Sequence, residues 1–282
     1  MPVHPPAPSE LGELVDAYAQ TVQCVIDLGR TTRPGDADLP TDCPGWTVRD
    51  QVAHVASTEA MVAGEPVPDI DVREHAHVRH AFGERVEKYV ESRRGRDLEE
   101  VLDELEERLA ERLHVYRSGH EWAEQQIQGP FGPTTMEGLL RIRVFDIWMH
   151  EQDIREALGR PGGLDSPAAA HSISRLFATL PRIVARDAAI EPGNAVVLDL
   201  TGPTVGRAGA RVEEHEGKAV GVPLFTGDAE EHPDVVTTSL TMSTQVAGRL
   251  AGGRRAPDEL HVVVHGDEDV ARRVLDHLVI TP

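Results

Sequence analysis

The chain has 282 residues, which is enough for one large domain or two ordinary ones, and hydrophobic residues make up 40% of it. Acidic residues outnumber basic ones by 48 to 28, so the formal net charge is −20, and such a field repels phosphate backbones and anionic lipid surfaces. Because no local basic patch offsets this charge, we expect neither nucleic acid nor a membrane surface as a partner.

The cellular location is indicated by what the sequence lacks. The N-terminal stretch has no basic region followed by an apolar run, so it does not have the pattern of a signal peptide. No apolar run approaches the roughly 18 residues of a membrane-spanning helix. Two cysteines, Cys24 and Cys43, are too few for a disulfide framework, and Cys43 has no base beside it in the sequence to make it a nucleophile. We therefore expect a soluble cytoplasmic protein, either a monomer or a homodimer.

The first two thirds of the chain have the spacing of apolar residues that is typical of amphipathic helices. Two of these helices begin with a capping box, formed by Thr47 with Asp50 and by Thr134 with Glu137. This pattern predicts that residues 9–187 form a helical bundle with up-down packing. The expected helices run from about Ser9, from Thr47, from about Glu84 to Tyr116, from Thr134 to about Leu158, and from about Ser166 to Arg186.

The pattern changes after Pro192, where alternating and β-branched segments follow one another with frequent glycines. AVVLDLTG and ELHVVVHGD have the composition of strands, and short helical stretches cover about Ser243–Ala251 and Asp267–Leu278. The sequence thus predicts an all-α domain over residues 1–190, built as a four-helix bundle. A smaller α+β domain is expected over residues 191–282.

The helix that begins at Thr134 carries the most informative polar residues. Because successive helical residues turn by about 100°, Asp146, His150 and Asp153 lie within an arc of roughly 60° on the apolar face. Unpaired charge on a core-facing surface is costly, and a metal ion is one of the few arrangements that offset the cost. An ion pair that satisfies itself inside the bundle, or a face lining an interdomain groove, is the alternative. Because this helix supplies only an Asp/His pair, a metal centre here needs a third ligand.

Fourteen histidines offer many candidates for that third ligand. His54 lies two turns into the helix that begins at Thr47, roughly 120° from its valine stripe, so it faces inward only if that helix contacts two neighbours. The segment EHAHVRH, which contains His75, His77 and His80, has the composition of a solvated charged segment. The spacing of residues therefore leaves the third ligand open.

Two segments of the sequence resemble one known family. The first is CPGWTVRDQVAHVA, which is similar to the N-terminal signature of the mycothiol-dependent maleylpyruvate isomerase family, one of the DinB-like metal-binding bundles. The second is RVFDIWMHEQDIREALGRPG, which resembles the last bundle helix of that family. The resemblance implies a divalent ion, zinc in particular, that is held by His54, Asp146 and His150, with Asp153 supporting them. The carboxylate of the family is often Glu, so Asp146 is a shorter arm.

The C-terminal stretch from Ser239 to Pro282 resembles the same family's C-terminal domain, which is similar to sterol carrier domains. In that family an arginine of this domain reaches the active site. The resemblance implies this role for Arg254, which follows two glycines, with Arg249 as the alternative. Arg143, about one turn from Asp146, is the next candidate for a cation that orients an anionic substrate.

The resemblance implies a mycothiol-using enzyme. A low-molecular-weight thiol would bind the divalent ion as its thiolate and attack an electrophilic small molecule, as an isomerase of maleylpyruvate-like compounds or as an S-transferase. Two other classes of function stay open. Two histidines and one carboxylate also form the facial triad of non-haem iron oxygenases, although those sites usually lie on β-barrels. A structural or sensing metal in the bundle, with an apolar ligand in the second domain, would make the protein a non-catalytic binder.

Overall fold

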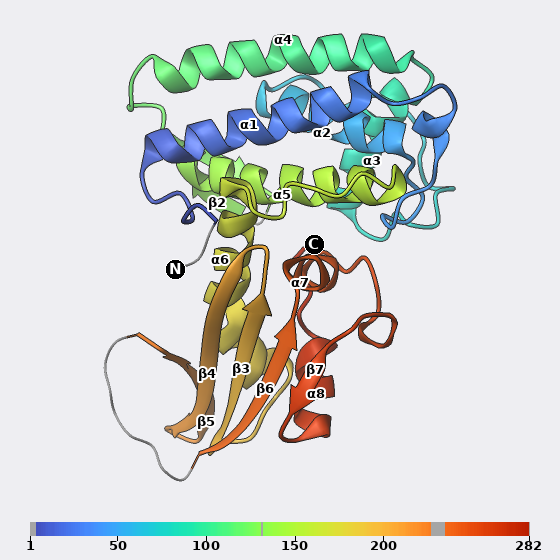
Figure 1. The fold of residues 1–282 in the computed structure, drawn as a ribbon. Coiled ribbons are helices and arrows are strands. Elements are labelled where there is room, and N and C mark those ends of the chain that lie inside the picture. The colour runs from blue at the N-terminus through green and yellow to red at the C-terminus, as the bar shows by residue number, and fades with distance from the viewer. Residues whose placement is uncertain (1–3, 131, 227–234, 282) are drawn as a thin grey trace. The chain divides into compact units, whose positions relative to one another are not determined.

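Figure 1 shows the fold of the computed structural model, which describes residues 4–130, 132–226 and 235–281. The chain divides into two compact units, one from Pro8 to Gly163 and one from Leu164 onward together with the residues before Pro8. No helix in these described ranges has both the length and the apolar character that crossing a bilayer requires.

The first unit is helical. α1 packs on α4 and α5, and α2 packs on the same two helices, so these four helices enclose one core; α3 packs on α2. Apolar residues of all four helices are fully buried in that core, which confirms the expected helical bundle. The helices are α1 (Leu11–Arg30), α2 (Val48–Val62), α3 (Ala81–Arg94), α4 (Leu98–Arg117) and α5 (Met136–Ala157), and a short 3-10 helix covers Asp36–Asp38.

The two expected capping boxes have different outcomes. Thr47 caps α2 as expected, because its side chain accepts from the Asp50 amide while the Asp50 carboxylate accepts from the Thr47 amide at 2.9 Å. The prediction that Thr134 and Glu137 form a capping box is wrong. Thr135 caps α5 instead and accepts from the Gly138 amide at 3.0 Å. A hairpin of β1 (Gln126–Gly129) and β2 (Gly132–Thr135) precedes α5, and Thr135 at the end of β2 directly precedes the first residue of the helix.

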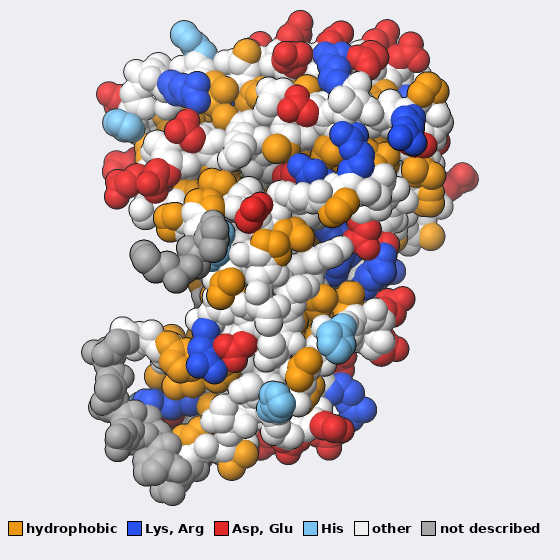
Figure 2. Space-filling view, in the orientation of Figure 1, with side chains coloured by type: hydrophobic (Ala, Val, Ile, Leu, Met, Phe, Trp, Pro, Cys, Tyr) orange, Lys and Arg blue, Asp and Glu red, His pale blue; other side chains and the backbone are white. Residues whose placement is uncertain are grey.

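The charged stretch expected as one helix is two helices. α3 ends at Arg94, with Gly95 as its C-cap, and α4 begins after Asp97. Glycine is a poor helix former and aspartate favours the position before a helix, so the sequence RGRD breaks the helical run. The exposed face of α4 is strongly acidic, as Figure 2 shows along the helix that lies uppermost in Figure 1. Arg30 from α1 pairs with three of its carboxylates, Glu99, Asp103 and Glu106.

The second unit is built on a five-stranded sheet of order β5-β4-β3-β6-β7. β3 and β6 are parallel and the other neighbouring strands are antiparallel. This confirms a sheet-containing C-terminal part. The elements are α6 (Pro167–Arg182), a π-helical turn (Ile183–Asp187), β3 (Asn194–Thr201), β4 (Val205–His215), β5 (Lys218–Leu224), β6 (Val236–Met242), α7 (Thr244–Ala251), a 3-10 helix (Pro257–Glu259), β7 (Val263–His265) and α8 (Glu268–Leu275).

The boundary between the units differs from the expected one near residue 190, because α6 belongs to the second unit. Leu176 and Leu180 of α6 are buried in the same core as Val196 and Leu198 of β3. Gly221 on β5 allows close packing here, since a Cβ at that position would lie 2.0 Å from the carbonyl oxygen of Pro181. A helical period alone does not show whether a helix packs on other helices or on a sheet.

Candidate metal centre

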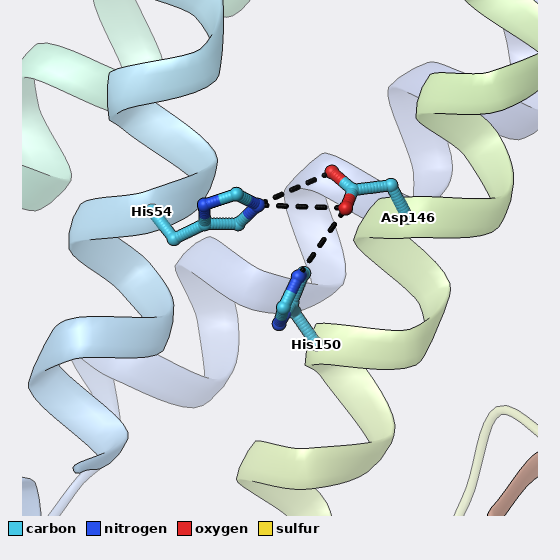
Figure 3. Close-up of side chains that lie close together, drawn as sticks. All are labelled: His54, Asp146 and His150. Atoms are coloured by element: carbon cyan, nitrogen blue, oxygen red, sulfur yellow. Dashed lines mark hydrogen bonds and ion pairs between the residues drawn. The ribbon is translucent and has the colours of Figure 1, made fainter. Parts of the chain in front are cut away.

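Three of the predicted site residues converge inside the helical unit. His54 comes from α2, and Asp146 and His150 come from successive turns of α5, as Figure 3 shows. His54 Nε2 lies 3.3 and 3.4 Å from the two carboxylate oxygens of Asp146, and His150 Nε2 lies 3.3 Å from Asp146 Oδ1. One donor atom from each residue lies within 4.8 Å of the others. The three side chains that the resemblance assigned as ligands are therefore adjacent.

The helix packing explains why these residues meet. Asp146 and His150 are four residues apart, so they lie one above the other on α5. α2 packs directly on α5 and also on α4, so a position well away from the valine stripe of α2 still faces the interior. His54 is accordingly only 6% exposed. The inward orientation that the sequence left open for His54 is thus decided by the second neighbour of α2.

The charges of the three residues suit a cation. Burial, with a smaller contribution from His150, lowers the pKa of His54 to about 4, so this ring is neutral near pH 7. Burial raises the pKa of Asp146, but His54, Arg143 and His150 outweigh it and hold that pKa well below its usual range. The site therefore offers an ionised carboxylate beside a neutral imidazole. The side chain of Asp146 is still 29% exposed, so the donors are not sealed from solvent.

Two side chains orient the ring of His150. Its Nδ1 lies 2.5 Å from Gln51 Oε1 and 3.6 Å from a carboxylate oxygen of Asp153. Both partners are acceptors, so this arrangement favours the tautomer with the proton on Nδ1, in which Nε2 presents a lone pair. Asp153 was expected to support the site, whereas Gln51 was not singled out from the sequence. Gln51 could have been found from its position three residues before His54, which places it one turn away on the same helix.

Trp46 forms a wall beside both histidines. Its ring centroid lies 4.9 Å from that of His54 and 5.6 Å from that of His150. Its indole N–H donates to Glu87 Oε2 at 2.8 Å, which fixes the orientation of the ring. Trp46 directly precedes the cap of α2, so the same turn that starts the helix brings the indole over the site. This contact limits the rotation of both imidazoles.

Arg143 is committed to the interior of the bundle. Its guanidinium donates to Glu59 Oε1 at 3.0 and 3.2 Å, to Asp146 Oδ2, and to the carbonyl oxygen of Val55 at 3.4 Å. Its side chain is 4% exposed. Arg143 was the next candidate after Arg254 for orienting an anionic substrate, and its guanidinium is engaged with Glu59, Asp146 and the carbonyl of Val55. Its role is to hold Asp146 ionised and in place.

The donor set fits a divalent ion. If Nδ1 of His150 holds the proton, its Nε2 lone pair faces a carboxylate oxygen at 3.3 Å, and that contact is repulsive without a cation between them. Two atoms bound tetrahedrally to zinc at roughly 2.0–2.1 Å lie about 3.3 Å apart, which is the spacing found here. His54 Nδ1 is buried and has no hydrogen-bond partner among the residues that the structure describes.

The histidine-rich segment before α3 differs from its expected solvated state. His77 is half-buried, and its Nε2 lies 2.9 Å from Glu87 Oε2. His75 lies beside the same carboxylate, and the three residues form a second group of potential metal ligands. His80 is separate from them, since it caps α3 by accepting from the Gly83 amide at 3.0 Å.

The comparisons with known proteins agree with this geometry. Residues 18–155 match the family model described as "Mycothiol maleylpyruvate isomerase N-terminal domain". These residues belong to that family. The matched range runs from α1 to α5 and includes His54, Asp146 and His150. The resemblance recognised in the CPGW and RVFDIWMHEQD segments is therefore confirmed for the helical unit.

Two solved structures have a similar fold over most of the chain. They are the mycothiol-dependent maleylpyruvate isomerase, at 15% identity and a TM-score of 0.53, and a histidine-to-alanine mutant of it, at 14% identity and a TM-score of 0.54. Each comparison covers 92% of this chain and 94% of the other. This similarity confirms the predicted fold class, a helical N-terminal region followed by a sheet-containing part. No curated protein matches the sequence.

The two candidate arginines of the second unit differ in exposure. Arg249 is in the last turn of α7 and is 2% exposed. Arg254 follows that helix, is half-buried, and donates from Nη1 to the Gly252 carbonyl at 2.7 Å. Gly253 between them has a φ of +61°, a left-handed conformation that ends the helix and that glycine adopts readily. Of the two, Arg254 is the more exposed.

Proposed function

We propose that this chain is a zinc-dependent enzyme that uses mycothiol to modify an electrophilic small molecule. The observation that carries the proposal is the spacing of 3.3–3.4 Å between Asp146 and the two imidazole Nε2 atoms, in a domain of the mycothiol maleylpyruvate isomerase family. Two histidines and one carboxylate leave one open position on a tetrahedral ion, which is typical of catalytic rather than structural zinc. When bound, the ion would lower the pKa of a coordinated thiol, so that thiolate is present at neutral pH.

The residues of this chain would hold and orient the reactants. His54, Asp146 and His150 would bind the ion, Gln51 and Asp153 would keep Nε2 of His150 directed at it, and Arg143 would keep Asp146 ionised. The thiolate would add to one carbon of an activated double bond, leaving a single bond about which the adduct rotates. Expulsion of the thiolate then gives the isomer, whereas protonation and release of the adduct give a conjugate. The first outcome is an isomerase of maleylpyruvate-like compounds, and the second is an S-transferase.

The position of the site on helices disfavours the oxygenase alternative. A facial triad of two histidines and one carboxylate also binds iron, but such sites usually lie on β-barrel scaffolds, whereas α2 and α5 carry these ligands. A metal-binding protein without catalysis is the other alternative. Since low-molecular-weight thiols stay reduced in the cytoplasm, we also propose that location.

The decisive experiment measures product formation by the zinc-loaded full-length protein with and without mycothiol, on maleylpyruvate and on a panel of electrophiles. We expect product only when zinc and mycothiol are both present. A trans isomer without consumption of thiol identifies an isomerase, and a thiol conjugate identifies a transferase. A zinc-bound protein that forms no thiol-dependent product would favour the non-catalytic alternative, and turnover of 2-oxoglutarate by the iron-loaded protein would favour the oxygenase.

Substituting Arg254 with alanine should lower turnover on an anionic substrate while leaving zinc content unchanged. The net charge of −20 disfavours binding of an anion unless a local cation offsets it, and the resemblance implies that Arg254 supplies that cation. Loss of one group that stabilises developing negative charge typically costs on the order of 100-fold in turnover. Arg272→Ala is the matched control, because Arg272 is exposed and pairs only with its neighbour Asp269 among the contacts described. Full turnover of the Arg254→Ala variant would contradict this role.

A further inference from the structure

A second group of donors lies at the start of α3. His77 Nε2 is 2.9 Å from Glu87 Oε2, and His75 Nε2 is 4.0 Å from Glu87 Oε1. Glu91, one turn after Glu87 on α3, has a carboxylate oxygen 3.4 Å from His75 Nε2. Donor atoms of His75, His77 and Glu87 all lie within 4.8 Å of one another. Two imidazoles and one carboxylate thus converge on one place, and the carboxylate of Glu91 lies beside His75.

The surroundings hold these donors in fixed positions. Gly45 has a φ of +79°, and a Cβ there would lie 2.2 Å from Nδ1 of His77, so the turn before α2 is shaped to admit the imidazole. Glu87 is 1% exposed, and its two oxygens accept from Trp46 at 2.8 Å and from Arg94 at 2.7 Å. Carboxylates that bind metals are commonly hydrogen-bonded in this way.

The charges of the cluster are incompletely balanced. Arg94 contacts three carboxylates, those of Glu87, Glu91 and Asp50. One guanidinium carries a single positive charge and does not neutralise three carboxylates. An additional cation would remove the imbalance around the buried Glu87.

We propose that His75, His77, Glu87 and Glu91 bind a second divalent transition-metal ion of the zinc type. Two imidazole nitrogens and two carboxylate oxygens are a suitable set for tetrahedral zinc. Because four protein ligands leave no open position, this ion is structural. It fastens the segment before α3 to α3 itself and, through the bond of Glu87 to Trp46, helps to keep the indole against His54 and His150.

Zinc binding by the chelator-treated full-length protein tests the proposal. We expect two equivalents for the wild type and for His114→Ala, a control at an exposed histidine of α4 that lies in neither group. We expect one equivalent for His77→Ala and for the larger replacement His77→Gln. The His54→Ala variant keeps the second group intact and should also bind one equivalent of zinc. The double variant with His54→Ala and His77→Ala should bind none.

The outcomes separate the two sites. A wild type that binds one equivalent, together with a His54→Ala variant that binds none, would overturn the second site and would mean that its residues form ion pairs only. One equivalent in the wild type that survives His54→Ala but not His77→Ala would support the second site and contradict the first. Because the His54→Ala arm does not alter the second group, a folding defect of the His77 variants would not obscure the result.

Discussion

Substituting His150 with alanine is expected to remove the ion from the proposed catalytic centre and to abolish mycothiol-dependent turnover. His150 supplies one of three donors, and a centre with one imidazole and one carboxylate binds zinc weakly. Changes to the partners of metal ligands already cost roughly 10–100-fold in metal affinity, so loss of a ligand should cost more than about 100-fold. Metal analysis after gel filtration and turnover at saturating mycothiol would measure the two effects.

Two control variants show whether the effect of His150→Ala comes from the loss of a metal ligand. Gln51→Ala removes the acceptor 2.5 Å from His150 Nδ1 but leaves all three donors, so zinc affinity should fall by only about 10–100-fold. His114→Ala should change neither quantity. If the His150→Ala variant retained zinc at the first centre and full turnover, the ligand assignment would be wrong.

Substituting Arg143 with methionine is expected to destabilise the helical unit by roughly 3–5 kcal/mol, the cost of removing one partner from a buried ion pair. Arg143 and Glu59 are 3% and 2% exposed, and Arg143 also compensates Asp146. The substitution leaves both carboxylates with less compensation in the interior of the bundle. Denaturant unfolding at neutral pH would measure the loss.

Arg117→Ala provides the matched surface control for this prediction. Arg117 pairs with Asp16 at 3.1 Å, but both side chains are more than half exposed. Exposed pairs contribute about 0–1 kcal/mol, so this variant should unfold close to the wild type. Equal stability of the Arg143→Met and Arg117→Ala variants would show that the buried network does not support the bundle.

Local sequence patterns determined much of this protein. The capping box at Thr47, the spacing of Asp146 and His150 on one helix face, and the change from helical to strand-like periodicity all concern residues close together in the chain. Periodicity and capping depend on hydrogen bonds and side-chain contacts within a few residues, and such contacts can be read from the sequence. The family resemblance then supplied His54 as the partner of the other two ligands.

The tertiary structure decided which faces meet. His54 points inward because α2 contacts both α4 and α5, and α6 joins the sheet because its apolar face is buried against β4 and β5 rather than in the bundle. The contacts of Gln51 with His150 and of His77 with Glu87 join residues from different elements. An apolar stripe specifies that a helix face is buried, but the same stripe can pack on a helix or on a sheet. The partner is therefore selected by the packing of the whole unit.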